Sequence, residues 1–381
     1  MDINQALPLL GGLSPQTFMK RHWQKKPLLI RQALPGFTPV LDRSALFELA
    51  ERDEVESRLI AFEQKKGQAV WRMRHGPMER RALPALKQAA WTLLVQGVDL
   101  HHEGVHDLLE QFRFVPEGRL DDVMISYASD GGGVGPHFDS YDVFLLQAKG
   151  QRRWQIGRQK DLTLRDDVPL KILANFEPEQ TFVLEPGDML YLPPGYAHDG
   201  VAVGGDCMTY SIGFRSPQRG ELARELLQRL AEDAADEVGD ALYRDAKQPA
   251  VSTPGAMPAA LQDFAREALQ AALKDPLALP RLLGEYLSEP KSNVWFEASA
   301  EDAVDGALDG GLELDLRSRM MYDDHHIFIN GESYRASGRD AKLMRQLADA
   351  RRLDARDMGK ASPAAVALLQ DWCDDGWLHG L

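Results

Sequence analysis

The chain has few cysteines and no long apolar run. Cys207 and Cys373 are the only two cysteines among the 381 residues, so neither a disulfide framework nor a thiolate metal site can be built from them. No apolar stretch approaches the roughly 20 residues that a membrane-spanning helix requires. The first residues also lack the basic and apolar regions of a signal peptide. These absences predict a cytoplasmic protein without a membrane partner.

Positive charge is also in deficit. The sequence has 44 Lys and Arg residues against 58 Asp and Glu residues, a formal net charge of −14. Such a surface repels phosphate, so direct nucleic-acid binding is not expected. It would attract a basic partner, such as a free ribosomal protein or a histone-like tail. A simpler interpretation stays open, in which the acidic surface only keeps the protein dispersed.

The chain does contain enough apolar sequence, 44% of its residues, for two or three domains. Ser14 followed by Pro15 predicts the start of a helix, and residues 28–30 predict a short strand. Residues 42–52 and 83–97 are predicted to be helical, the second because its apolar residues recur at helical spacing.

Between residues 121 and 215 the sequence changes to short runs of β-branched and aromatic residues separated by Gly and Pro. Several strands at such close spacing predict a β-barrel or sandwich. A tight turn is expected at residues 185–188. The predicted strands are residues 123–128, 142–148, 153–157, 181–184, 189–192 and 209–214.

After residue 216 the strand pattern gives way to amphipathic helices, for which self-association and simple packing against the barrel are both open. Further along, two strand-like segments and three helices predict a small α+β module of winged-helix appearance. Because it is acidic, this module is not expected to grip DNA. The predicted helices are residues 222–230, 261–273, 276–290, 340–351, 354–359 and 363–374, and the predicted strands are residues 312–316 and 326–332.

The most informative pattern is His137-Phe138-Asp139, with His198 further along the chain. Two imidazoles and one carboxylate can occupy one face of an octahedral ion and leave the other positions open, which is the ligand set of non-haem Fe(II) oxygenases. A lone His-x-Asp occurs by chance in many proteins. Here it follows a Gly-rich turn at residues 131–135, and His198 follows a predicted strand, so the two segments are expected to meet around an ion.

A basic residue between these segments extends the pattern. A 2-oxoglutarate co-substrate would chelate iron through its keto acid end, and its second carboxylate would need a cation such as guanidinium. Strand alternation places Arg152 on the face of Trp154 and Arg153 on the other, but parity does not show which face lies inside. Both arginines could instead be solvated. Ser126 is a candidate to hydrogen-bond the co-substrate, or an ordinary barrel-lining serine.

Two other patterns resemble metal sites. His102-Glu103-Gly104-Val105-His106 matches the motif of zinc metalloproteases, which needs both histidines one turn apart on a stable helix. Gly104 costs about 1 kcal/mol of helix stability relative to alanine, and no third ligand is evident, so we expect no zinc site. The Asp-Asp-His-His sequence at residues 323–326 is interpreted as a solvated turn.

Several motifs resemble a known family. Phe18 and Trp23 with Lys26-Pro27-Leu28 resemble the N-terminal segment of cupin-type JmjC oxygenases. Within that family, the bacterial ribosomal oxygenases are similar along the whole chain. The motifs that carry this resemblance are residues 121–127, 131–139, 141–144, 184–188 and 191–195 with His198.

The resemblance implies an α+β protein. Its parts would be a double-stranded β-helix (the cupin or JmjC fold) at residues 1–215, a helical dimerisation region at 216–300 and a winged-helix-like domain at 301–381. A homodimer is therefore expected.

The resemblance also implies Fe(II), 2-oxoglutarate and O2 as cofactor and co-substrates. His137, Asp139 and His198 would be the iron ligands, Arg152 the anchor of the co-substrate carboxylate, and Ser126 a further co-substrate contact. The implied reaction is hydroxylation at C3 of an arginine in the sixteenth large-subunit ribosomal protein. A JmjC lysine demethylase, and a catalytically silent cupin that acts as a ribosome-assembly binding module, are the alternatives.

Overall fold

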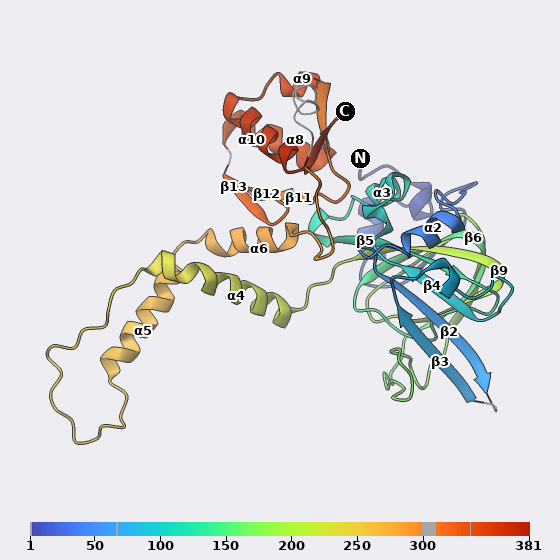
Figure 1. The fold of residues 1–381 in the computed structure, drawn as a ribbon, viewed down its shortest axis with the longest axis horizontal. Coiled ribbons are helices and arrows are strands. Elements are labelled where there is room, and N and C mark those ends of the chain that lie inside the picture. Colours follow the sequence, from blue (N-terminus) through green and yellow to red (C-terminus); the bar gives the residue numbers. More distant parts are fainter. Residues whose placement is uncertain (1, 66–67, 299–309, 336) are drawn as a thin grey trace. The chain divides into compact units, whose positions relative to one another are not determined.

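The computed structural model of the protein describes residues 2–65, 68–298, 310–335 and 337–381 (Figure 1). The chain divides into two compact units, Met1–Ser216 and Pro217–Leu381. Within the described residues, no helix is both long and apolar enough to cross a membrane.

The first unit is built on a nine-stranded sheet in which every pairing is antiparallel. Its two longest strands, β6 and β9, pair with each other near the middle of the sheet, and β7 pairs with β6 outside the main order. Along the sheet the strands are β1 (Leu28–Ile30), β8 (Met189–Leu192), β6 (Asp142–Gly157), β9 (Ala197–Phe214), β5 (Leu120–Ala128), β4 (Trp91–Val95), β2 (Ser57–Lys65) and β3 (Gln68–His75), with β7 (Gln180–Leu184) beside β6.

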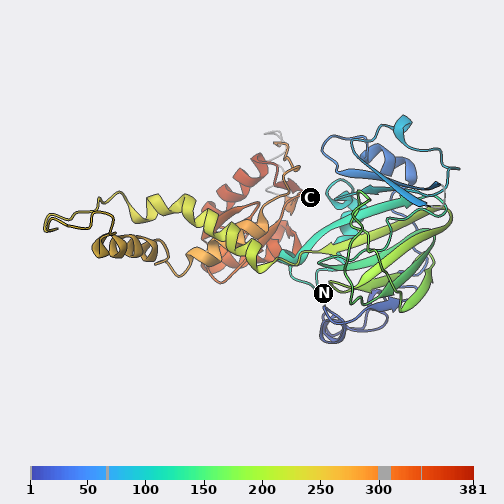
Figure 2. The ribbon, with the colours of Figure 1, turned by 90° about the horizontal axis from the view of Figure 1, so that it is seen from below.

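The long strand β6 pairs with different strands along its length. Its first half pairs with β8 and its second half pairs with β7, while β9 accompanies it throughout. Figure 2 shows the green strands of this unit curving around a common interior. Side chains from both halves of β6, including Leu145 and Trp154, share one buried cluster with Leu190. The face of β6 that carries Leu145 and Trp154 is therefore the interior face of the barrel.

Short helices close the first unit. Ser14 Oγ accepts a hydrogen bond from Thr17 N at 3.2 Å, which confirms the predicted cap and satisfies one of the free N–H groups of the first turn. The helices are η1 (Pro8–Leu10), α1 (Pro15–Arg21), α2 (Arg43–Leu49), η2 (Arg80–Ala82), η3 (Val98–Leu100), α3 (Glu103–Glu110) and η4 (Glu117–Arg119).

The predicted helix at residues 83–97 is wrong. Residues 91–95 form strand β4, which is buried along its whole length between β2 and β5. A short apolar run buried on both faces has no alternation to distinguish it from helix, so helical spacing was misleading. The hairpin of β2 and β3 was not predicted at all.

Three predicted strands were too short. Residues 142–148 and 153–157 belong to the single strand β6, and residues 209–214 are the end of β9. Both strands pass through irregular register near Lys149, where Gly150 has a positive φ of 66°. Glycine signals a turn and a β-bulge equally well, so the sequence pattern suggested breaks where the ladder continues.

The second unit begins with three helices, α4 (Arg219–Val238), α5 (Ala259–Ala272) and α6 (Ala278–Ser288). The described residues of its remaining part form two three-stranded sheets and three helices around a core that includes Leu347, Leu369 and Trp372. These elements are β10 (Gly311–Leu314), β11 (Met320–Tyr322), β12 (His326–Ile329), β13 (Glu332–Arg335), α8 (Gly338–Ala350), β14 (Arg352–Asp354), α9 (Ala355–Met358), α10 (Pro363–Asp374) and β15 (Leu378–Gly380).

Most helices of this unit confirm their predictions, and α10 begins and ends at the predicted residues. The interpretation of residues 323–326 as a solvated turn is wrong for His326, which is buried on β12 and contacts the Asp323 carboxylate. The expected domain boundary near residue 300 lies outside the described residues, so the three-part division stays a prediction.

Candidate active site

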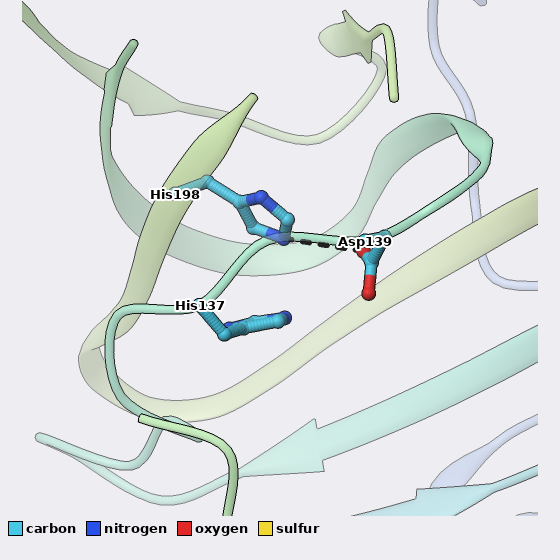
Figure 3. Close-up of side chains that lie close together, drawn as sticks. All are labelled: His137, Asp139 and His198. Carbon is cyan, nitrogen blue, oxygen red and sulfur yellow. Dashed lines mark ion pairs between the residues drawn. The ribbon is translucent and has the colours of Figure 1, made fainter. Parts of the chain in front are cut away.

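Three side chains from two separate segments of the first unit lie close together (Figure 3). One ligand atom from each of His137, Asp139 and His198 can be chosen so that all lie within 4.8 Å of one another. His198 Nε2 lies 3.6 Å from Asp139 Oδ2, and the two imidazole centroids are 4.3 Å apart. Among the described residues, this is the one group of three or more His, Cys, Asp and Glu side chains with metal-binding geometry.

The backbone brings these residues together. His137 N donates to His198 O at 3.0 Å, His198 N donates to His137 O at 2.8 Å, and Gly195 N donates to Asp139 O at 2.7 Å. The Gly-rich turn allows this close approach, because a Cβ on Gly133 would lie 2.6 Å from Gly200 O. A larger residue at position 133 would therefore push the His137 segment away from β9.

Each imidazole is oriented by a backbone carbonyl. His137 Nδ1 lies 2.8 Å from Gly135 O and His198 Nδ1 lies 3.1 Å from Tyr196 O. A carbonyl can only accept, so each Nδ1 carries the proton and each Nε2 keeps its lone pair for a ligand. Metal-binding histidines commonly have this outer support, because it fixes both the tautomer and the ring orientation.

The surroundings of His198 favour its neutral form, which can bind a metal cation. Burial, together with the neighbouring His137 ring, lowers the pKa of His198 to about 4. The imidazole is therefore neutral at neutral pH, the form that binds metal. Two imidazoles and one carboxylate fit a divalent ion such as Fe(II).

The structure places Arg152 inside the barrel and Arg153 outside. Arg152 is 3% exposed, whereas Arg153 is exposed. The interior side chains Trp154 and Ile156 share the face of Arg152, and Ile156 pairs with His198 across the strands. The open choice left by strand parity is thus decided in favour of Arg152.

The Arg152 guanidinium is poorly satisfied by the protein. Nη1 lies 3.4 Å from Gly200 O and Nη2 lies 3.4 Å from Ser126 Oγ, while the buried Nε has no partner. Within the described part of the chain it forms no ion pair. A buried unpaired cation is costly, and a ligand carboxylate would satisfy it with two charge-assisted hydrogen bonds. The residues present therefore fit a dicarboxylate such as 2-oxoglutarate.

Ser126 lies beside Arg152 on the interior face of β5. Its hydroxyl also donates to Thr209 O at 3.4 Å, so the serine is both a wall residue and a possible ligand contact. Two neighbours of Ser126 were not predicted as site residues: Gln147 and Thr209 are fully buried, and Thr209 Oγ1 donates to Gln147 Oε1 at 3.0 Å. A glutamine at the end of the apolar run of residues 143–146 was the available signal.

Tyr141 lies two residues after Asp139 and its side chain is 41% exposed. Partial burial, with the carboxylates of Asp139, Asp122 and Asp121 nearby, raises the pKa of its hydroxyl. The phenol therefore stays protonated over the whole working range of pH, next to carboxylates that favour a cation.

Among the described residues, the His-Glu-x-x-His pattern belongs to no group of three or more possible metal ligands. Its segment forms the short helix α3, with His102 at the N-cap position. His106 lies on that helix, where its Nε2 is 3.7 Å from Glu110 Oε1. The expectation that no zinc binds here stays a prediction.

Comparison with known proteins agrees with this geometry. The family model of the JmjC domain matches residues 107–222, and that of the ROXA-like winged helix matches residues 270–379. A crystal structure of Escherichia coli YcfD superposes with a TM-score of 0.82 at 31% sequence identity, and the match covers 95% of this chain and 97% of that one. The chain belongs to the JmjC-type ribosomal oxygenases.

Relatives of this family with assigned names match over part of their length. The ribosomal protein uL16 3-hydroxylase of Escherichia coli is 39% identical over 246 residues, which cover 64% of this chain and 61% of the relative. A probable ribosomal oxygenase of Haemophilus influenzae is 36% identical over 214 residues, 55% of this chain and 52% of that one. These sequence matches thus span between half and two thirds of the relatives.

The family also fixes the cofactors. A YcfD structure in complex with cobalt and 2-oxoglutarate is 30% identical to this chain, with a TM-score of 0.79 over 96% of this chain and 98% of that one. Cobalt there stands in for iron. This JmjC ribosomal oxygenase accordingly uses Fe(II), 2-oxoglutarate and O2, as predicted.

Proposed function

We propose that this JmjC ribosomal oxygenase hydroxylates C3 of an arginine in the basic ribosomal protein uL16. His137, Asp139 and His198 hold the iron, and Arg152 with Ser126 anchors the distal carboxylate of 2-oxoglutarate. The observation that carries the proposal is the buried guanidinium of Arg152, which lies on the same interior face as His198 and forms no ion pair with a carboxylate of the described residues. The uL16 substrate is taken from the name of the Escherichia coli relative.

The protein supplies positions rather than bond-making groups. Iron held by these three side chains, together with 2-oxoglutarate, would supply the oxidising chemistry: one atom of O2 would enter the substrate C–H bond and the other would enter succinate, with loss of CO2. The carbonyls of Gly135 and Tyr196 hold both imidazoles in the metal-binding tautomer. Arg152 selects a dicarboxylate, because a keto acid without a second carboxylate leaves its charge unpaired.

The surroundings of the site suit a cationic substrate. The exposed ring of Tyr141 lies close to the Asp139, Asp122 and Asp121 carboxylates, and the whole chain has a formal charge of −14. A guanidinium can stack on a phenol ring and is attracted by nearby carboxylates. Long-range attraction would also accelerate the encounter with a basic protein at low ionic strength.

Mass spectrometry of uL16 tests the proposal directly. The purified ribosomal protein is incubated with the enzyme, Fe(II), 2-oxoglutarate and O2, and matched samples omit the co-substrate. A gain of one oxygen on an arginine, dependent on 2-oxoglutarate, is the expected result. Loss of a methyl group with formaldehyde release would instead indicate a lysine demethylase, and binding without turnover would indicate a silent binding module.

We further propose that the helical part of the second unit supports a homodimer. No residue of α4 is buried, and Leu227 on α4 and Leu269 on α5 are 64% and 70% exposed. Exposed apolar side chains gathered on neighbouring helices mark a surface for self-association. The winged-helix-like part is proposed to contact protein rather than nucleic acid, since the chain is acidic.

A further inference from the structure

Two interior residues of β6 have a spacing that a regular strand does not allow. Gln147 and Arg152 are five positions apart, and side chains an odd number of residues apart point to opposite faces of a regular strand. Both are nevertheless buried, with exposed fractions of 0% and 3%. Leu145 before them and Trp154 after them also share one interior cluster. The strand must therefore change face between Gln147 and Arg152.

A β-bulge makes that change. Gln147 pairs with Thr209 and Lys149 pairs with Met208, so β6 advances two residues where β9 advances one. The extra residue moves the following side chains to the other face. Without it, Arg153 would occupy the interior and Arg152 would point outward. The position of the proposed co-substrate anchor thus depends on this bulge, rather than on local sequence around Arg152.

The side chain of Gln147 ties the bulge together. Its Nε2 donates to Lys149 O at 2.8 Å and to Gly150 O at 3.3 Å, and its Oε1 accepts from Thr209 Oγ1 at 3.0 Å. The two carbonyls can only accept, so they fix which way the amide points. An apolar residue here would leave these carbonyls without their donor, in an interior where such a loss is costly.

Gln147 is also connected to Arg152 by a second route. Thr209, its hydrogen-bond partner, accepts through its backbone oxygen from Ser126 Oγ, and Ser126 Oγ accepts from Arg152 Nη2. Through the bulge, Gln147 determines the face of β6 on which Arg152 lies. Through Thr209 and Ser126, it positions the side chain that the Arg152 guanidinium contacts. Both routes begin at Gln147.

We propose that Gln147 is a positioning residue for 2-oxoglutarate: it holds the bulge that aims Arg152 at the distal carboxylate. This inference rests on the proposed role of Arg152 as the anchor. Gln147 itself need not touch the co-substrate or the metal. Its removal should therefore weaken recognition of the distal carboxylate and leave the metal site and the keto acid end unaffected.

The test compares two keto acids on the full-length protein. 2-Oxoglutarate has a distal carboxylate, whereas 2-oxobutyrate offers the same keto acid end without it. Calorimetry under anaerobic conditions measures both dissociation constants, and that of Co(II), for wild type, Gln147→Leu and Gln151→Leu. Gln151 is the matched control, because it is an exposed glutamine of the same strand whose amide contacts Glu185.

For Gln147→Leu we expect roughly a tenfold weaker affinity for 2-oxoglutarate, the usual effect of losing one charge-assisted hydrogen bond. Affinity for 2-oxobutyrate and for Co(II) should change little, and Gln151→Leu should resemble wild type throughout. Equal weakening of both keto acids would overturn the proposal, since it would show a general structural role. Unchanged affinity for 2-oxoglutarate would overturn it as well.

Two further variants separate this proposal from the one on which it rests. Thr209→Val keeps the shape of the side chain and removes only the hydroxyl that donates to Gln147. A smaller, selective loss of 2-oxoglutarate affinity in this variant supports the proposal even if Gln147→Leu folds poorly. Unchanged 2-oxoglutarate affinity in this variant contradicts the proposal. Arg152→Ala should abolish the preference for 2-oxoglutarate over 2-oxobutyrate. If that preference survives in Arg152→Ala, the anchor assignment itself is wrong.

Discussion

At the scale of single residues, the first prediction concerns the carboxylate Asp139. Asp139→Ala leaves two neutral imidazoles, a set that binds divalent ions weakly. Because a catalytic metal supplies several kcal/mol, 2-oxoglutarate turnover should fall by more than about a hundredfold. Succinate formation and Co(II) binding measure the two effects. Asp130→Ala is the control, because this exposed carboxylate accepts from Gly204 N at the surface. Full hydroxylation by Asp139→Ala would refute the ligand assignment.

A second prediction at this scale concerns pH and His198. Its pKa is lowered from 6.5 to about 4 in the folded protein, so between these values the unfolded chain binds a proton that the folded chain does not. Above pH 6.5, titration of His198 should not change the free energy of unfolding of the metal-free protein. Below that pH, the free energy of unfolding should decrease by on the order of 1 kcal/mol per pH unit.

Urea unfolding of the metal-free protein over this pH range, with His198→Asn for comparison, measures the effect. The variant lacks the titrating imidazole, so its stability should depend less steeply on pH than that of wild type. Parallel stability curves for the two proteins would show that His198 keeps its ordinary pKa in the fold.

At the scale of elements, the bulge in β6 yields a prediction about glycine. Gly150 has a φ of +66°, and a Cβ there would lie 3.0 Å from Asp206 O. Gly204, in the nearby bend of β9, has a φ of +75° with open space around it. Alanine at either position costs about 1–2 kcal/mol for the left-handed backbone.

Gly150→Ala should be destabilised more than Gly204→Ala, because it adds a steric contact with the backbone. It should also bind 2-oxoglutarate more weakly, since the bulge directs Arg152. Urea unfolding and calorimetry on both variants check these expectations. Equal stability losses, with co-substrate binding unchanged, would show that the bulge tolerates a side chain at residue 150.

At the scale of the whole molecule, the prediction is self-association. Light scattering should give twice the chain mass of 42.5 kDa for wild type, and the double variant Leu227→Glu, Leu269→Glu should be monomeric, because charges are excluded from an apolar interface. Leu162→Glu is the control: this leucine of the first unit is 48% exposed. A wild-type protein that is monomeric at micromolar concentration would end the dimer proposal.

Elements whose boundaries are marked by capping residues or by alternating apolar residues could be predicted from the local sequence. Ser14 caps α1, and Ser362 followed by Pro363 marks the beginning of α10. Alternation and turn residues located most barrel strands, whose boundaries were less accurate where glycine marks a bulge. The buried strand β4 was missed because a run that is apolar on both faces has no period to read.

The chemical types of the site residues can be identified from the amino-acid sequence alone. His137, Asp139 and His198 have the chemistry of an Fe(II) centre whatever surrounds them, and an arginine had to lie close if a dicarboxylate binds. That Arg152 lies inside the barrel, by contrast, follows from how the strands pair in the folded protein. Side-chain parity along a strand is a local property, but a bulge is defined by the partner strand, here β9, and that partner is distant in sequence. The role proposed for Gln147 arises from the same pairing.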